Sequence, residues 1–460
     1  MTLNTRRIIM FSFIGAFFIL APLLLFYASG YRLDLKRYQI IKTGTLFIEA
    51  KDIKNATISL NAKKQPELFD GKKYIYNLLP GEYQITLSKD GYHDWNKKAV
   101  IYSGLTTFVQ DAILFRNEIP LQMLDTKITD FYPSPDWSNI VYVSANDTFK
   151  ELYLYNISSK QKTLLYRLAA PVEPKISWAA SSKKILLSYS GNFIIIDAQN
   201  PGSAYSLKNI INFSPTQIQW DIQSDSLLYT MAGNTIYKID LFSKISAKIY
   251  TDANGNLNPA IFIEGNDIFY IEQTAAQNTL AKYNLNFKTT KNIANLSKSA
   301  NYQFVSSANN YLGLIDLDQQ KLYLIEKTNT DLDINLSSDQ QTRKLNAKNA
   351  IWDDKEKQLL YYDDFEISTF NAGENKEQFI NRYGQVIKKI SWYPDLEHFV
   401  MLQDNKLDII DTTQEVGTRN TINLIKFDQI DNFYLDRKGE YLYFNGQIGK
   451  QQGLYQLKLK

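Results

Sequence analysis

The chain has 460 residues, of which 44% are hydrophobic and 22% charged, so it carries enough apolar side chains for large buried cores and is not a disordered chain. Its 51 basic and 48 acidic side chains nearly balance, which argues against a nucleic-acid-binding protein. The absence of cysteine excludes disulfides, thiolate nucleophiles and cysteine-bound zinc, and the presence of only two histidines argues against multi-histidine metal sites. We therefore expect a protein that is not an enzyme and that uses no cofactor.

The N-terminal residues predict a membrane anchor. Residues 1–7 are polar and include Arg6 and Arg7, whereas residues 8–28 form an uncharged and strongly apolar run. A helix over this run would be about 30 Å long at about 1.5 Å per residue, which matches the hydrocarbon core of a bilayer. We expect a cytoplasmic tail over residues 1–7, a single transmembrane signal-anchor helix over residues 8–28 and a juxtamembrane linker over residues 29–39.

The triplet Ala28-Ser29-Gly30 leaves a second interpretation open, because small residues at its ends are typical of a signal-peptide cleavage site. Cleavage would release a secreted protein. The apolar run is longer than the core of a signal peptide, which spans about 7–15 residues, and this favours a retained anchor. Long domains that follow an anchor usually cross the membrane whatever the flanking charge. We therefore expect a cytoplasmic N-terminus and an extracytoplasmic bulk.

Residues 40–117 predict a small antiparallel β-sandwich. Short runs rich in β-branched and aromatic residues alternate with dipeptides that favour tight turns. Tyr83, Ile85 and Leu87 share one face of a strand and are expected to form part of the core. The turn dipeptides are Asp70-Gly71, Pro80-Gly81 and Asp90-Gly91. The six expected strands cover residues 45–49, 56–60, 73–76, 83–87, 98–102 and 107–114.

The stretch from Leu78 to Tyr92, followed by Trp95, resembles the PEGA domain family, a module associated with bacterial surface layers. The resemblance consists of a Pro-Gly turn, a strand with an aromatic residue and a Gly-Tyr pair, although the Pro-Glu-Gly-Ala string of the family is absent. It implies a fold but no ligand. The matching residues are Pro80, Gly81, Tyr83, Gly91 and Tyr92.

Residues 118–460 repeat a unit of about 43 residues, in which an aromatic residue ends one strand and an apolar strand follows after a polar turn. Four short strands in about 40–45 residues indicate a β-propeller blade. A single blade cannot bury both of its faces, whereas a ring of blades can. We expect each aromatic residue to wedge between neighbouring blades. These blade anchors are Tyr132, Trp178, Trp220, Phe262, Phe304, Trp352, Trp392 and Tyr434.

Eight anchors predict eight blades, and seven is the alternative because the fifth unit carries a polar insertion over residues 328–342. The last unit stops after its third strand, and residues 119–124 could supply the missing outer strand and close the ring. The runs from Tyr132 to Asp136 and from Trp392 to Asp395 make the repeat similar to the TolB-type and WD40-like propellers of bacterial envelope proteins. The expected fold class is all-β: one transmembrane helix, a PEGA-like sandwich and a propeller.

Few residues indicate chemistry. Asp252, Asn254 and Asn256 alternate oxygen ligands as a calcium loop does, but the later glutamate and the central glycine of such a loop are missing. They are weak metal candidates, and we predict no catalytic, cofactor-binding or metal residue. His93 follows a turn and is expected at the surface. His398 opens a strand, where it could pair with Asp395 and Ser391, and is expected to be a satisfied or surface histidine.

The sequence therefore predicts a membrane-anchored, extracytoplasmic binding or scaffolding protein of the bacterial cell envelope. Its propeller loops would recognise an envelope protein or a cell-wall glycan, because function in such folds lies in the loops. The other expected partner is the lipid bilayer, through residues 8–28, and no nucleic acid. Two alternatives remain, a propeller enzyme that acts in the central channel and a binder of cell-wall carbohydrate.

Overall fold

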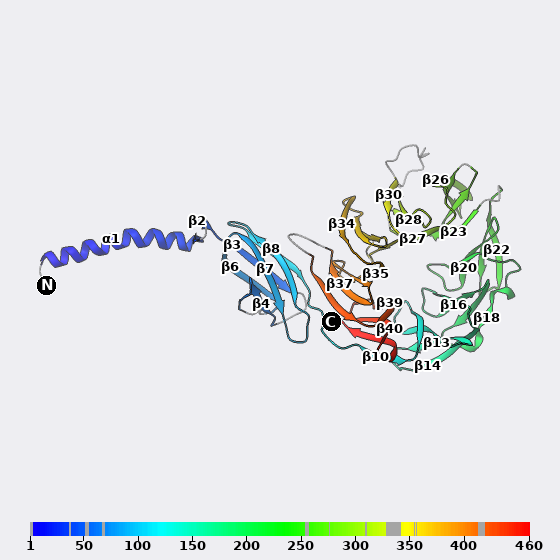
Figure 1. Ribbon diagram of the computed structural model, residues 1–460. Helices are drawn as coiled ribbons and strands as arrows, with labels where there is room; N and C mark the ends of the chain where they lie inside the picture. The colour runs from blue at the N-terminus through cyan, green and yellow to red at the C-terminus, as the bar shows by residue number, and fades with distance from the viewer. Residues whose placement is uncertain are drawn as a thin grey trace.

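The computed structural model describes residues 3–35, 38–50, 55–66, 70–253, 257–275, 277–308, 311–327, 342–353, 355, 357–412 and 419–460. It contains one long N-terminal helix, a small β-sandwich and a ring of β-sheets, in that order along the chain (Figure 1). The sandwich lies between the helix and the ring (Figure 1). The expected all-β architecture with one N-terminal apolar helix is confirmed.

Helix α1 (Leu3–Ala28) is long and apolar enough to cross a membrane, with a mean hydropathy of 2.6, and none of its residues is buried against the rest of the chain. It begins at Leu3, earlier than the expected residue 8, because arginines such as Arg6 and Arg7 are good helix formers and continue the first turns. Regular structure also occurs in the expected linker, residues 29–39. It contains β1 (Tyr31–Asp34) and the start of β2 (Gln39–Lys42), which pair as an antiparallel hairpin.

The sandwich consists of two sheets that enclose one core, in which Ile85, Leu87 and Trp95 are fully buried. Tyr83 packs against the edge of this core. The expectation of purely antiparallel pairing is wrong, because β3 and β9 pair in parallel after a crossover through the second sheet. The strands are β3 (Gly44–Ala50), β4 (Thr57–Leu60), β5 (Lys63–Lys64), β6 (Lys72–Leu78), β7 (Gly81–Ser88), β8 (Trp95–Ile101) and β9 (Thr106–Ala112). Their orders are β6-β3-β9 and β5-β4-β7-β8.

Eight four-stranded sheets follow in the described part of the chain, so the prediction of eight blades is confirmed and the seven-blade alternative is wrong. In Figure 1 they run around the ring from β13 through β20 and β28 to β40. The first four blades comprise β11 (Ile128–Pro133), β12 (Asn139–Ala145), β13 (Phe149–Asn156) and β14 (Lys162–Ala169); β15 (Lys175–Trp178), β16 (Lys184–Tyr189), β17 (Asn192–Asp197) and β18 (Tyr205–Ser206); β19 (Gln217–Trp220), β20 (Leu227–Ala232), β21 (Thr235–Asp240) and β22 (Ile245–Thr251); and β23 (Leu257–Glu264), β24 (Asp267–Gln273), β25 (Asn278–Asn284) and β26 (Thr289–Leu296).

The second blade also carries two short 3-10 helices, η1 (Pro201–Ser203) and η2 (Leu207–Asn209), around its outer strand. The last four blades comprise β27 (Tyr302–Ala308), β28 (Tyr311–Asp316), β29 (Lys321–Glu326) and β30 (Thr342–Asn346); β31 (Asn349–Trp352), β32 (Gln358–Tyr362), β33 (Glu366–Asn371) and β34 (Lys376–Arg382); β35 (Ile387–Trp392), β36 (His398–Gln403), β37 (Lys406–Asp411) and β38 (Thr421–Lys426); and β39 (Gln429–Leu435), β40 (Tyr441–Ile448), β41 (Gln451–Lys458) and β10 (Leu121–Asp125).

The ring closes as the sequence predicts, because β10 pairs antiparallel with β41 and supplies the outer strand of the eighth blade. A separate hydrophobic core fills each junction between neighbouring blades, including the junction between the eighth and the first. At that last junction the Asn445 amide donates to the Ile128 carbonyl at 3.1 Å, and Phe131 and Leu454 are fully buried.

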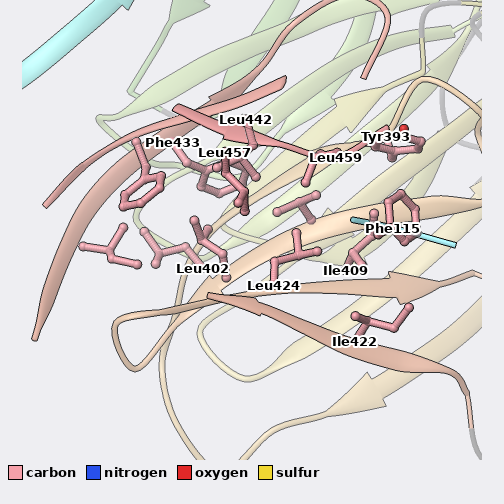
Figure 2. Close-up of a cluster of buried hydrophobic side chains, with 14 of the residues drawn as sticks. Phe115, Tyr393, Leu402, Ile409, Ile422, Leu424, Phe433, Leu442, Leu457 and Leu459 are labelled. Carbon is pink, nitrogen blue, oxygen red and sulfur yellow. The ribbon is translucent and has the colours of Figure 1, made fainter. Parts of the chain in front are cut away.

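Residues 113–117 join the sandwich to the ring. Phe115 is fully buried in the core between the seventh and eighth blades, and its ring meets that of Tyr393 edge to face at 5.3 Å (Figure 2). The backbone N–H of Arg116 donates to the Leu459 carbonyl at 2.9 Å, and that of Asn117 donates to the Gly91 carbonyl at 3.0 Å. The connecting segment is therefore bonded to both domains.

Candidate functional site

The aromatic anchors all lie on the first strand of their blade, which is the innermost strand because the first strands of adjacent blades contact one another. Three of the tryptophans also bond across the blade junction. The indole N–H of Trp178 donates to the Tyr132 carbonyl at 3.0 Å, and that of Trp220 donates to the Ser177 carbonyl at 3.1 Å. The indole of Trp392 donates to the preceding blade in the same way, at 2.9 Å. These side chains therefore join neighbouring blades, and their indole N–H groups are already bonded.

The remaining anchors pack in the same junctions. Trp352 lies in the core between the fifth and sixth blades, and Tyr434 packs against the core between the eighth and the first. Phe262 and Phe304 are half-buried, as Tyr132, Trp178 and Tyr434 are, but their two rings stack on each other, with centroids 5.7 Å apart and planes 25° from parallel. They therefore expose ring surface at the inner wall of the propeller.

A cavity of about 390 Å³ lies at this wall, between the innermost strands β19, β23 and β27. Its polar lining consists mainly of amides, and the side-chain oxygen of Gln219 is buried without a hydrogen-bond partner in the described part of the structure. Uncharged amides beside aromatic faces suit a neutral ligand with several hydroxyl groups. The lining residues are Gln217, Gln219, Ala260, Ile261, Phe262, Tyr302, Gln303 and Phe304.

A polar cluster around the single lysine Lys389 lies in the opposite part of the inner wall. The Lys389 ammonium donates to the Asn432 side-chain oxygen and to the Phe433 carbonyl, both at 2.7 Å, and lies 3.6 Å from the centre of the Tyr434 ring. Burial lowers the pKa of Lys389 to about 8, although Asp130 partly opposes this shift. Since the amide of Asn432 also donates to Asp130 at 2.9 Å, the cluster connects the seventh, eighth and first blades.

His398 forms a buried ionic cluster instead of an open site. Its Nδ1 lies 2.7 Å from Asp395 Oδ2 and its Nε2 lies 2.7 Å from Asp411 Oδ1. The expected pairing with Ser391 is wrong, because the hydroxyl of Ser391 points to the Trp392 carbonyl at 3.4 Å. Burial alone lowers the pKa of His398, but hydrogen bonds and charge from the two aspartates raise it to about 10. A histidine that keeps its proton and contacts a carboxylate at each nitrogen is no general base near neutral pH.

His93 does not lie at the surface as expected. It is half-buried at the junction between the sandwich and the propeller, and its backbone N–H donates to the Phe115 carbonyl at 2.8 Å. Burial lowers the pKa of His93, with partial opposition from Asp94. The sequence could not show this, because Phe115 reaches the histidine only after the last strand of the sandwich has been placed.

The weak metal candidates lie partly outside the described residues, since neither Asn254 nor Asn256 is described. Asp252 is buried, and its backbone N–H donates to the Asn234 carbonyl at 3.0 Å. Within the residues that the structure describes, no group of three or more histidines and acids could hold a metal ion. Asp316 and Asp318 are close in the sequence, and each of their side chains accepts a backbone N–H group in or next to a turn. These hydrogen bonds give the two acids a structural role.

A turn that recurs between the third and fourth strands of several blades was not predicted from the sequence. An Asp or Asn side chain accepts two backbone N–H groups there, as Asp240 and Asn284 do, and the residue four positions later adopts a positive φ, as at Lys244 (56°) and Lys288 (54°). The spacing of an acid or amide and a lysine is visible in the sequence and could have located these tight hairpins.

Two of these turns expose phenylalanine. The side chains of Phe242 and Phe287 are 90% and 79% exposed, and Ile222, in the turn after β19, and Ile245, the first residue of β22, are 57% and 60% exposed. Turns after the first and third strands of an antiparallel blade lie at the same end of it, and the third and fourth blades share a core. These four residues, which we call the apolar turn patch, therefore lie on the same face of the ring.

No protein-family model and no curated protein matches the chain. Among solved structures, the Dos1 propeller matches with a TM-score of 0.52 and 10% identity, over 74% of this chain and 95% of its own. The C-terminal WD40 domain of Sif2 matches with a TM-score of 0.48 and 11% identity, over 74% and 98% of the two chains. The similarity to the Dos1 propeller agrees with the propeller fold and carries no information about a ligand.

Proposed function

We propose that this protein is a membrane-anchored binding or scaffolding protein of the bacterial cell envelope, and that it is not an enzyme. In this proposal α1 remains in the membrane, and the sandwich and the propeller lie on the extracytoplasmic side. The length and apolar character of α1 support the anchor. The resemblance of the sandwich to PEGA domains, and that of the repeat to TolB-type propellers, support the envelope location.

The observation that carries a binding function is the apolar turn patch. Single exposed apolar residues are common on soluble proteins, but a group of them on adjacent turns marks an interaction surface. Phe242 and Phe287 contribute most of this surface, and aromatic side chains are enriched where proteins contact each other. The patch lies on turns that a rigid ring holds in place, which is the usual position of recognition residues. The preferred partner is therefore a protein with an apolar surface of its own.

This proposal is tested by capture of partners with the full-length chain in mild detergent. The variant that combines Phe242→Ser and Phe287→Ser removes the two largest side chains of the patch, and both residues are so exposed that the fold should be unaffected. A matched control is Phe379→Ser, which removes a 57%-exposed phenylalanine from the outer strand β34.

The expected result is one envelope protein that the wild type and the control both retain and that the patch variant loses. Equal retention by all three chains would show that the patch does not bind that protein. The catalytic alternative is tested with the same preparations: turnover of a small molecule by the wild type would contradict the non-enzymatic proposal.

A cell-wall glycan is the second candidate ligand, because the inner-wall cavity combines Gln217, Gln219 and Gln303 with the stacked rings of Phe262 and Phe304. Stacking faces and amides together fit the apolar and hydroxylated sides of a sugar ring. Soluble cell-wall fragments should then bind in calorimetry to the wild type. The variant Gln303→Ala should bind them more weakly, and Gln161→Ala, at an exposed position in the first blade, should bind them normally.

A further inference from the structure

The hairpin of β1 and β2 has one apolar and one polar face. Leu33 and Ile40 are register partners, so their side chains point to the same side, and they are 58% and 65% exposed. Leu35 and Tyr38, at the ends of the strands, are 71% and 85% exposed. The alternate positions along the strands carry mainly polar residues, such as Asp34 with its partner Gln39. The hairpin is therefore amphipathic, with its apolar side uncovered by the described part of the chain.

A hairpin of this kind is not expected to be stable on its own in water. It forms a two-stranded sheet of its own, separate from both sheets of the sandwich. Isolated two-stranded sheets are only marginally stable unless a hydrophobic face is covered. The exposed face of Leu33 and Ile40 would be covered if it lay against an apolar phase.

Several contacts hold the hairpin against the C-terminal end of α1. The Arg32 guanidinium donates to the Tyr27 carbonyl at 2.7 Å and lies 3.6 Å from the centre of the Tyr27 ring. The rings of Phe26 and Tyr31 meet edge to face at 5.6 Å. The Gly30 carbonyl accepts the backbone N–H of Thr43 at 2.8 Å, so the start of the sandwich closes the same structure. The hairpin therefore cannot move far from the point where α1 ends.

We propose that the β1–β2 hairpin is an interfacial membrane anchor, whose apolar face of Leu33, Leu35, Tyr38 and Ile40 is immersed at the boundary between headgroups and acyl chains. This inference rests on the proposed function, because it requires that α1 spans the bilayer. A helix that crosses the bilayer places its end at the headgroup level, and the contacts of Tyr31 and Arg32 keep the hairpin beside that end. Amphipathic elements with tyrosine and basic residues at their edges are stable at this depth.

The hairpin changes what the anchor does. A helix followed by a flexible linker would leave the sandwich free to move above the membrane. An immersed hairpin fixes the height of the sandwich instead, because Thr43 bonds to Gly30, two residues after the end of α1, and β3 begins at the next residue. The partner of this surface is the lipid bilayer that surrounds α1.

The absence of cysteine from the chain allows a direct test with single cysteines that carry an environment-sensitive fluorophore. The full-length variants Phe18→Cys, Ile40→Cys, Gln39→Cys and Lys183→Cys are placed in phosphatidylcholine–phosphatidylglycerol nanodiscs. Nitroxide lipids then quench the fluorophore, with the nitroxide either near the headgroup or deep in the acyl chain. Phe18 reports on the middle of α1, Gln39 on the polar face of the hairpin and Lys183 on the exposed surface of the propeller.

The expected result is strong quenching of the Phe18→Cys label by the deep nitroxide and of the Ile40→Cys label by the shallow one. The Ile40 label should also emit at a shorter wavelength than the Gln39 label, and the Lys183 label should not be quenched. If Phe18 is quenched and Ile40 is not, the hairpin proposal fails while the membrane anchor stands. If neither is quenched, α1 does not span the bilayer and both proposals fail.

A second pair of variants covers the case in which a label disturbs the hairpin. The chain with Leu33→Ser and Ile40→Ser, labelled at Leu35→Cys, should lose the quenching by the shallow nitroxide that the same label shows in the chain with both apolar residues. Unchanged quenching in the serine variant would show that the apolar face does not hold the hairpin in the interface, and would overturn the proposal.

Discussion

Replacement of His398 by glutamine tests how the buried ionic cluster stabilises the propeller. In the native protein both ring nitrogens of His398 lie 2.7 Å from a carboxylate oxygen, of Asp395 and of Asp411, and the side chain is 2% exposed. Glutamine is neutral, so the variant leaves two buried carboxylates without their shared positive partner. Removal of one member of a buried ion pair typically costs about 3–5 kcal/mol. We expect a loss of that size in the free energy of unfolding at pH 6.

The stabilisation should depend on pH in a defined direction. The pKa of His398 is about 10 in the folded protein, whereas an unfolded histidine has a pKa near 6.5. The folded state therefore keeps a proton that the unfolded state releases. Its contribution is complete below about pH 6.5 and is lost progressively as the pH rises to about 10. At about 1.4 kcal/mol per pKa unit, the upper limit of this loss is about 5 kcal/mol.

Lys389 acts in the opposite direction and must be separated from His398. Its folded pKa of about 8 lies below the 10.5 of an unfolded lysine, so the folded state releases this proton first and gains stability between about pH 8 and 10.5. A background with Lys389→Met removes this effect. The comparison of that background with and without His398→Gln then isolates the histidine.

The measurement is urea unfolding in mild detergent at pH 6, 8 and 10, followed by tryptophan fluorescence. Every tryptophan except Trp95 lies in the propeller, so the signal reports mainly on the ring. The difference between the two chains should be largest at pH 6 and should shrink toward pH 10. A difference that stays constant from pH 6 to pH 10 would refute the assignment of a charged His398, because a neutral histidine would contribute equally at both values.

Two further substitutions test the closure of the ring and the junction. Gly453→Ala places a Cβ 1.9 Å from the Leu124 carbonyl oxygen, so β10 must shift, and the free energy of unfolding in urea should fall by about 1–3 kcal/mol. The control Gly384→Ala, whose Cβ would meet no atom within 4 Å, should leave stability unchanged. Equal stability of the two variants would contradict closure of the ring by β10. Phe115→Ala leaves a cavity at a fully buried position against Tyr393, so the free energy of unfolding should fall by about 3–5 kcal/mol. The connecting segment, residues 113–117, should also become sensitive to protease. An unchanged unfolding midpoint would contradict the place of Phe115 in the core.

The propeller ring could be predicted from the sequence because the same pattern of strands and aromatic residues recurs in every blade. Each blade buries both faces only against its neighbours, so an aromatic anchor recurs in every unit, and the missing fourth strand of the last unit points to the chain before the first anchor. The parallel pairing of β3 with β9 was not predictable in this way. Alternation of residues shows which face of a strand is buried, but it does not show which strand lies beside it.

The candidate sites were harder to predict, because they depend on residues that meet only in the folded chain. Asp411 lies at the end of the strand that follows His398, and its side chain reaches the histidine because β36 and β37 pair with His398 opposite Asp411. The cavity between β19, β23 and β27 needs three consecutive blades to be placed at once. The apolar turn patch is the exception, since the turn spacing and its phenylalanines are both local in the sequence.

The eighth blade, which closes the ring, also contacts the connecting segment, residues 113–117. The chain leaves the sandwich through Phe115, bonds to Leu459 at the end of the last strand and turns into β10, which pairs with β41. Any displacement of the sandwich relative to the ring must therefore break contacts with the seventh and eighth blades. Phe115 packs in the core between the seventh and eighth blades, whereas the apolar turn patch belongs to the third and fourth. A partner that binds the patch as proposed would therefore sit on blades that do not contact the connecting segment, and we expect it to leave that segment undisturbed.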